Sequence, residues 1–348
     1  MSSAPPNPSA ALPREVIIAR PRGSRFAFWL GWAGFLFCAL ALIGLRSRFA
    51  DYFDQTGGIT EKFVSGGKFA DEKVAVITVD GVIMGGDGFV KKQIEKIRED
   101  KDVKAIVLRI DSPGGTVTGS DYLYHHLKKL RDERKLPVVV SMGSMAASGG
   151  YYLAMAVGDT ERSIFAEPTT MTGSIGVMIP RYDVSELLEK IHVKDDAIAS
   201  HERKLMLSMT RPLVGEQREL IQGTVNDMFE RFKAIVKEGR PVYRKDPSAL
   251  DQLATGEVFL ADKAKLHGLV DEIGFVEDAI DRALELAHLT KSQTRVVKYH
   301  QDGSLLEALG VPAAKLTAPS SPLEGLFDLA TPRAFYLYSA FPAAMSAR

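Results

Sequence analysis

The feature that most constrains the fold of this chain is a series of continuous apolar runs separated by stretches with helical periodicity. The runs read "KVAVITVDGVIM" (73–84), "VKAIVLRI" (103–110) and "LPVVVSM" (136–142). A polar helix is predicted after the first run, to about Asp100, and another from Thr118 to Arg134. Strands that are apolar along their whole length and joined by helices belong to parallel sheets covered on both faces. The sequence therefore predicts an α/β fold.

The second half of the chain continues this alternation. "GSIGVMIP" (173–180) predicts another strand, and "DVSELLEKI" (183–191) predicts a helix. A long helix is predicted over 215–238, where apolar residues form one stripe that we interpret as core or as a contact between subunits. A helix that ends at Gly268 and a last helix over 276–289 complete the pattern.

An apolar segment precedes the α/β region. The stretch "FAFWLGWAGFLFCALALIGL" (26–45) carries no charge, and as a helix it would span roughly 30 Å, the thickness of a bilayer core. A cleaved signal peptide is the alternative, but the run exceeds the usual length of about 7–15 residues, and its one Ala-x-Ala lies inside it. We therefore expect an uncleaved anchor. The excess of arginine over acid before it favours a cytoplasmic N-terminus, with the remainder of the chain outside the cytoplasm.

Composition excludes several classes of function. The 44 basic residues balance the 44 acidic ones, so nothing in the charge favours a nucleic-acid partner. Cys38 is the single cysteine, which excludes intramolecular disulfides and cysteine-based metal sites. No metal or organic cofactor is predicted.

These patterns divide the chain into five segments. We expect a cytoplasmic tail (1–25), a transmembrane anchor (26–45), a linker (46–72), an α/β domain (73–300) and a C-terminal tail (301–348).

Three glycine-rich stretches lie next to predicted strands. They are "DSPGG" (111–115), "ASGG" (147–150) and "TGSIG" (172–176). Since the carboxyl ends of parallel strands share one edge of a sheet, the first two should meet there. Glycine amides can turn into a cleft and donate to a developing oxyanion, although "PGG" is equally suited to a tight turn.

Ser148, in "MAASGGYYLAM", has two interpretations. Serine is a favoured helix cap, and an apolar helix is predicted directly after it. As a nucleophile it would need a base. Of the seven histidines, only His192 and His201 are candidates for the base of a Ser-His triad. Lys204, next to Arg203 and followed by apolar residues, could serve as a base if its amine were neutral.

Together these stretches resemble the signal peptide peptidase A (protease IV) family of membrane-anchored serine proteases. The resemblance covers about 74–287 and rests on five motifs in order: "RIDSPGG", "SMGSMAASGGYYLA", "TMTGSIGV", "TRPL" and "HGLVDEIG". It implies the crotonase/Clp-protease fold, a parallel sheet with covering helices. The single set of motifs resembles the half-length form of the family.

The resemblance also implies roles for individual residues. Ser148 would be the nucleophile, Lys204 the general base, and Ser174 the residue that positions the lysine. Backbone amides at Gly114 or Gly115 and at Gly149 would form the oxyanion hole. The lysine stretch reads "SHERKLM", without the glycine and aspartate usual in relatives, so Lys194 is kept as an alternative base.

The implied function is a Ser-Lys endopeptidase that degrades remnant signal peptides and other unfolded membrane-associated peptides. The resemblance implies the bacterial inner membrane, with the catalytic domain on the periplasmic side. It also implies a homo-octamer in which Ser148 of one subunit meets Lys204 of its neighbour. Two alternatives are an inactive membrane scaffold of the same fold and an acyl-CoA enzyme of the crotonase fold.

Overall fold

The computed structural model describes residues 23–53, 58–301 and 334–337. The chain divides into two compact units, residues 1–55 and 56–348. In the first unit, helix α1 (Gly23–Phe53) contains the apolar span Phe28–Arg46, none of which is buried. Among the described residues, α1 is the one helix long and apolar enough to cross a bilayer, a property that signal sequences share. The predicted tails, 1–25 and 301–348, lie mostly outside the described residues.

The described part of the second unit is built on a nine-stranded sheet. Seven strands follow the order β1, β10, β2, β3, β5, β6, β9, and β7 pairs with both β5 and β8. All these pairs are parallel except β1 with β10 and β7 with β8. The bounds are β1 (Ile59–Gly66), β2 (Glu72–Asp80), β3 (Val103–Ser112), β5 (Val138–Ala147), β6 (Ile164–Ala166), β7 (Met171–Gly173), β8 (Val258–Leu260), β9 (Glu272–Ile273) and β10 (Thr294–Gln301).

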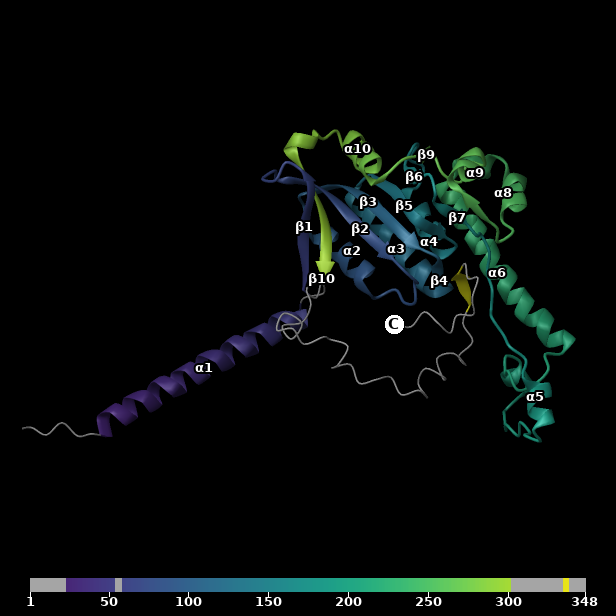
Figure 1. Ribbon diagram of the computed structural model, residues 1–348, viewed down its shortest axis with the longest axis horizontal. Helices are drawn as coiled ribbons and strands as arrows, with labels where there is room; N and C mark the ends of the chain where they lie inside the picture. The colour runs from purple at the N-terminus through teal and green to yellow at the C-terminus, as the bar shows by residue number, and fades with distance from the viewer. Residues whose placement is uncertain (1–22, 54–57, 302–333, 338–348) are drawn as a thin grey trace, which may run out of the picture. The chain divides into compact units, whose positions relative to one another are not determined.

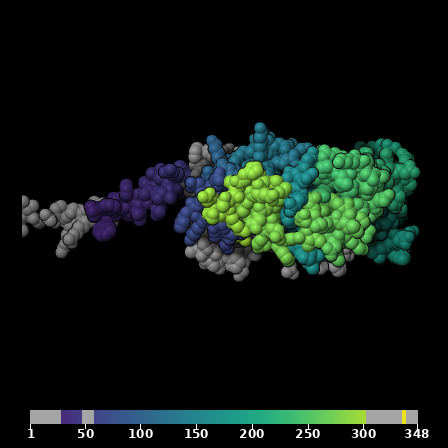
Figure 2. All heavy atoms as spheres, turned by 90° about the horizontal axis from the view of Figure 1, so that it is seen from above, coloured from purple at the N-terminus to yellow at the C-terminus, as the bar shows by residue number. Residues whose placement is uncertain are grey.

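Helices cover both faces of this sheet (Figure 1). On one face, α2 (Phe89–Glu99), α3 (Val117–Arg134) and α4 (Gly149–Ala154) pack on the larger apolar cluster. On the other face, α10 (Val276–Leu286) packs on alternate residues of the same strands, such as Val74 and Val107. Figure 2 shows the yellow-green atoms of this second covering layer. The continuous apolar runs therefore have the physical cause that the sequence indicated, burial on both sides, and the α/β prediction is confirmed.

The other helices follow at the end of the sheet beyond β7. They are α5 (Ser185–Lys190), α6 (Gly215–Gly239), α7 (Pro241–Lys245), α8 (Pro247–Leu253) and α9 (Ala261–Leu266). Short 3₁₀ turns lie at Met155–Val157 after α4, at Glu202–Leu205, and at Lys291–Gln293 next to β1 and β10. A separate two-stranded sheet pairs β4 (Gly114–Thr116) with β11 (Phe335–Leu337).

Two expectations about the elements need correction. The strand predicted over 173–180 is wrong: β7 ends at Gly173, and beyond it Met178 forms an isolated bridge with Phe335. An apolar run becomes a strand only where a second strand lies beside it, and here the partner is a short tail segment. Within the predicted linker, Ile59–Gly66 forms strand β1 at the edge of the sheet. Ile59 is its one buried residue, so the strand has little alternation that a sequence could reveal.

Residues 179–214, which we call the arm, extend away from the sheet (Figure 1). The arm contains α5 and the 3₁₀ turn Glu202–Leu205. No residue of the arm is buried, and Leu187, Ile191 and Ile198 are exposed, Ile198 fully. An extended segment that exposes apolar side chains lacks the packing that normally stabilises a folded chain.

Candidate active site

Ser148 lies between β5 and α4, in the N-cap position of the helix. Its φ of 53° and ψ of −115° are rarely adopted by residues other than glycine. Its N–H donates to the carbonyl of Gly173 at 2.8 Å, and its carbonyl accepts from the N–H of Tyr152 at 2.9 Å. The hydroxyl makes no capping hydrogen bond. Ser148 thus begins the helix with its backbone alone, which leaves the side chain available at a cavity.

The cavity that Ser148 lines has a volume of about 550 Å³. Its walls are the loop after β7, one face of α6, the turn 254–256 and residues of β11. Ser174 lies on the same wall, directly after the Gly173 carbonyl that binds Ser148. Its φ is 50°, and its N–H donates to the carbonyl of Glu257 at 2.7 Å. Two neighbouring serines in an uncommon backbone conformation, each fixed by a hydrogen bond, point to a functional site.

The glycine-rich loops after β3 and β5 meet beside Ser148, as the parallel sheet predicts. A Cβ atom built on Gly114 would lie 2.6 Å from the nitrogen of Gly149, and one on Gly149 would lie 3.1 Å from the nitrogen of Gly115. Gly114 has a φ of 99°, which disfavours any other residue there. Its N–H donates to the hydroxyl of Ser112 at 3.1 Å. The amides of Gly115 and Gly149 are therefore the better candidates for an oxyanion hole.

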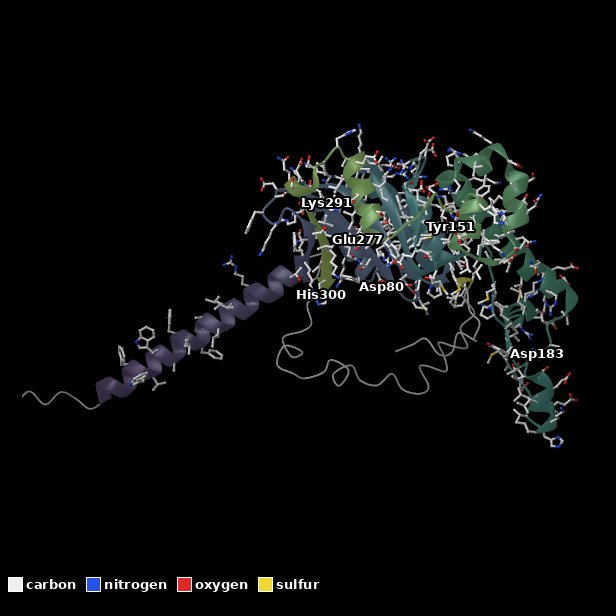
Figure 3. The ribbon with its side chains drawn as sticks, turned by 45° about the horizontal axis from the view of Figure 1, so that its top comes forward. Asp80, Tyr151, Asp183, Glu277, Lys291 and His300 are labelled. Atoms are coloured by element: carbon white, nitrogen blue, oxygen red, sulfur yellow. The ribbon has the colours of Figure 1, made fainter. Side chains whose placement is uncertain are left out.

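The predicted bases all lie on the arm. Lys204 is exposed in the turn Glu202–Leu205, and Lys194, His192 and His201 are exposed as well. The imidazole Nδ1 of His201 accepts the N–H of Arg203 at 3.1 Å. No residue of the arm lines the cavity that contains Ser148. Figure 3 labels Asp183 on the arm, apart from Tyr151 in the helix that follows Ser148. The structure brings Ser148, Ser174 and the glycines together, whereas Lys204 lies on the arm and does not line their cavity.

A hydrogen-bonded cluster closes the loop that presents Lys204. The carboxylate of Asp195 accepts from the hydroxyl of Thr210 at 2.5 Å and from Nε of Arg211 at 2.8 Å. The Arg211 guanidinium is the main cause that holds the pKa of Asp195 well below its usual range. Arg181 also donates to the carbonyl of Ser208 at 2.9 Å. The "TRP" of the lysine stretch thus joins the two ends of the loop, which fixes where Lys204 can lie.

The remaining motif, "HGLVDEIG", is structural. Asp271 accepts from the N–H groups of Ser163 at 3.0 Å and Ile164 at 2.9 Å and pairs with Arg240 at 2.8 Å. The carbonyl of Leu269 accepts the hydroxyl of Tyr151 at 2.9 Å. These contacts fix the start of β6 against α4 and do not reach the cavity.

Several residues of the site were not predicted from the sequence. Gln222, Asn226 and Phe229 of α6 line the cavity on one helix face. Their spacing of four and three was visible, but two of the three side chains are polar, and the apolar stripe of this helix was interpreted as core or as a contact between subunits. The contribution of β11 was not predicted, because a segment so far along the chain shows no sign of its partner.

Tyr152 of α4 is fully buried, and its ring packs edge-on against Phe232 of α6. Burial, and then its hydrogen bond to Asp121 at 2.5 Å, raise the pKa of this phenol well above its usual range. Asp121 also pairs with Arg231 of α6 at 2.6 Å. Tyr152 therefore stays neutral and acts as a rigid surface that α6 holds in place. Among the described residues, no group of three or more histidine, cysteine, aspartate or glutamate side chains is arranged to hold a metal ion.

A buried serine of unusual backbone geometry, two glycine amides beside it and an open groove are suited to acyl transfer through a serine ester. Comparison with known sequences agrees. The model of peptidase family S49 matches residues 130–290. A provisionally named signal peptide peptidase SppA of Enterococcus faecium is 32% identical over 302 residues, which are 80% of this chain and 85% of that protein. The chain belongs to peptidase family S49, the signal peptide peptidase A (protease 4) family.

Two further relatives are longer than this chain. Protease 4 of Salmonella typhi is 37% identical over 237 residues, 66% of this chain and 36% of that protein. The chloroplastic serine protease SPPA of Arabidopsis thaliana is 34% identical over 242 residues, 68% of this chain and 34% of that protein. The matched part of this chain thus spans about a third of the length of these two relatives.

Proposed function

We propose that this chain is a membrane-anchored serine endopeptidase whose nucleophile is Ser148 and whose general base is Lys204 of a neighbouring copy. One observation carries the proposal. Ser148 precedes α4, but its hydroxyl makes no capping hydrogen bond. Ser148 lines the cavity, next to the amides of Gly115 and Gly149. A helix cap would instead have its side chain bonded to the backbone of the next turn.

The chemistry follows from these positions. The neutral amine of Lys204 takes the proton of the Ser148 hydroxyl as its oxygen attacks the scissile carbonyl carbon. The amides of Gly115 and Gly149 stabilise the negative oxygen of the tetrahedral intermediate. The ammonium of Lys204 then protonates the leaving amine, and water, activated in the same way, hydrolyses the ester and regenerates Ser148. Ser174, on the wall beside Ser148, would position the incoming amine by a hydrogen bond.

The arm supports a site shared between copies. It carries Lys204, has no buried residue, and exposes apolar side chains such as Leu187 and Ile198. A second copy that accepted the arm would bury these side chains and bring Lys204 to its own Ser148. We propose a closed ring of such copies, with eight as the expected number from the family resemblance.

Helix α1 supports the proposed location and substrates. Its apolar span, Phe28–Arg46, would hold the catalytic unit at the bacterial inner membrane, on the periplasmic side. Signal peptides released into a bilayer are apolar segments that an anchored peptidase would meet there. We propose such remnants, and other unfolded membrane-associated peptides, as substrates.

Labelling by a fluorophosphonate tests the nucleophile. The full chain in detergent micelles should form one adduct, on Ser148 by peptide mass mapping, and Ser148→Ala should abolish it. Ser144→Ala is the matched control, because Ser144 lies four residues earlier in β5 and its hydroxyl binds Asp111 at 2.7 Å. This control should label like the wild type. An assembled wild-type protein that neither labels nor cleaves peptides would contradict the proposal and favour an inactive scaffold.

A further inference from the structure

Ser120, in the first turn of α3, is a buried polar residue that the chemistry proposed above does not use. The residue is completely buried, and its Oγ has no hydrogen-bond partner among the described residues. A buried hydroxyl normally has a partner, because an unpaired donor away from water destabilises the fold. One acceptor open to a helical serine is the carbonyl four residues earlier, here that of Thr116, and this bond is not made. The position of Ser120 provides a reason for this exception.

The hydroxyl of Ser120 lies against the proposed oxyanion hole. A Cβ atom built on Gly149 would lie 2.4 Å from Ser120 Oγ and 3.1 Å from the nitrogen of Gly115. By covalent geometry, the same point lies about 2.5 Å from the nitrogen of Gly149. One small region is therefore bordered by the nitrogens of both proposed amide donors and by the oxygen of Ser120.

The start of α3 holds Ser120 in this position. Thr116 is the N-cap of α3, and its Oγ1 accepts the N–H of Gly119 at 3.1 Å and donates to the carbonyl of Met84 at 2.9 Å. Gly115 directly precedes this cap. One amide donor and Ser120 thus belong to one continuous, hydrogen-bonded segment. A donor that is fixed before the reaction needs little reorganisation when charge develops beside it.

We infer that Ser120 is a third donor of the oxyanion hole, whose hydroxyl pairs with the negative oxygen of the tetrahedral intermediate. This inference rests on the proposed peptidase function. The O–H bond of Ser120 is kept throughout, and its hydrogen is donated to the oxygen that also accepts from the amides of Gly115 and Gly149. None of the described groups competes for this hydroxyl, so it is available when that oxygen becomes charged. A hydrogen bond to a charged acceptor is stronger than one to a neutral acceptor, so Ser120 stabilises the intermediate more than the bound peptide.

Loss of this hydroxyl should lower the rate of cleavage without lowering the stability. Ser120→Ala removes the donor and keeps the Cβ atom, so kcat should fall by about 10- to 100-fold, the usual effect of a hydrogen bond to a charged group. KM should stay within about twofold, because the neutral peptide carbonyl gains little from this donor. The unfolding temperature should stay the same or rise, because the substitution removes an unpaired buried hydroxyl.

Thr294→Val is the matched control. Thr294 begins β10 and is completely buried, and its Oγ1 also has no partner among the described residues. It does not line the cavity that contains Ser148. The valine variant should therefore keep kcat within about twofold of the wild type, with an unfolding temperature that is the same or higher. This control separates the general effect of removing an unpaired buried hydroxyl from the effect of removing the one beside the oxyanion hole.

The rate of fluorophosphonate labelling at Ser148 tests the inference directly, in the full chain in detergent micelles. In the adduct a phosphonyl oxygen takes the place of the negative oxygen, so Ser120→Ala should label about 10- to 100-fold more slowly than the wild type. Thr294→Val should label at the wild-type rate.

Equal labelling rates for Ser120→Ala and the wild type would overturn the inference. A slow variant with a lower unfolding temperature would also overturn it, because Ser120 would then support the fold. A higher KM with kcat unchanged would likewise overturn it, since the hydroxyl would then bind the peptide and the intermediate equally. A wild-type protein that does not label would contradict the proposed function, and this inference with it, so the two failures are distinguishable.

Discussion

The nine-stranded sheet with its covering helices, which we call the sheet unit, and the arm (179–214) differ in how they are stabilised. Around Ser148, residues are buried, the loops meet within van der Waals distance, and the backbone is fixed by hydrogen bonds. Along the arm, no residue is buried, and the loop that presents Lys204 is closed by Asp195 and Arg211. The proposed nucleophile and oxyanion donors are therefore arranged within one chain. The proposed base, Lys204, lies on a segment that exposes apolar side chains.

Removal of the proposed base, Lys204, should have the largest effect. Lys204→Ala should lower kcat/KM for a peptide substrate by about 10³-fold, because general-base catalysis by a placed side chain contributes about 10²- to 10⁴-fold. Lys194→Ala, ten residues earlier on the same arm, should stay within about twofold of the wild type. The reverse ranking in steady-state assays would assign the base to Lys194.

A substitution at Gly114 tests the proposed oxyanion donors, which lie in the sheet unit. Gly114→Ala places a methyl group 2.6 Å from the Gly149 nitrogen and should lower kcat/KM by about 10²- to 10³-fold. Gly81→Ala is the control: its φ of 71° gives similar strain, but nothing lies within 4 Å of the new methyl. Activity per folded molecule should persist in the control. If both variants lose activity equally, strain and not the oxyanion hole is responsible.

Disruption of the cluster at Asp195 should have a smaller effect, because it changes only the position of Lys204. Asp195→Asn weakens the bonds to Thr210 and Arg211, so kcat should fall by about tenfold while the unfolding temperature of the sheet unit changes little. Asp195→Glu keeps the charge and should recover part of the loss. A higher KM with kcat unchanged would instead indicate that Asp195 contacts the substrate.

Substitution of His126 in α3 should have the smallest effect, and this effect should be on the stability of the sheet unit. Burial, and then the positive charge of Lys91, lower the pKa of this imidazole to about 4. In the unfolded chain its pKa is about 6.5, so unfolding takes up a proton below that value. The free energy of unfolding should thus fall as the pH drops from about 6.5 to 4. Urea unfolding of His126→Gln should show a weaker fall, and an identical pH dependence would remove His126 as its source.

The sequence was sufficient for the parts that depend on local pattern. Apolar runs located β2, β3 and β5, and a parallel sheet then brought "DSPGG" and "ASGG" to one edge. The uncommon φ of Ser148 and its uncapped hydroxyl could not be predicted, since they depend on the bond to Gly173 from another strand.

Contacts distant in sequence account for the rest. The strand expected over 173–180 was wrong because its neighbour is Phe335, more than 150 residues further on. Tyr336 lies in a region rich in proline and alanine, and its ring packs on Tyr152 of α4 and Phe232 of α6. No periodicity in either stretch indicates the other.

The central claim is that one site takes Ser148 from one chain and Lys204 from its neighbour. Ser148→Ala and Lys204→Ala proteins, each inactive, should be unfolded together, refolded into mixed rings and assayed for peptide cleavage. In random equal mixtures, a quarter of the sites would pair an intact serine with an intact lysine, so about a quarter of the wild-type activity should return. Verified mixed rings that stay as inactive as the separate variants would contradict the shared site.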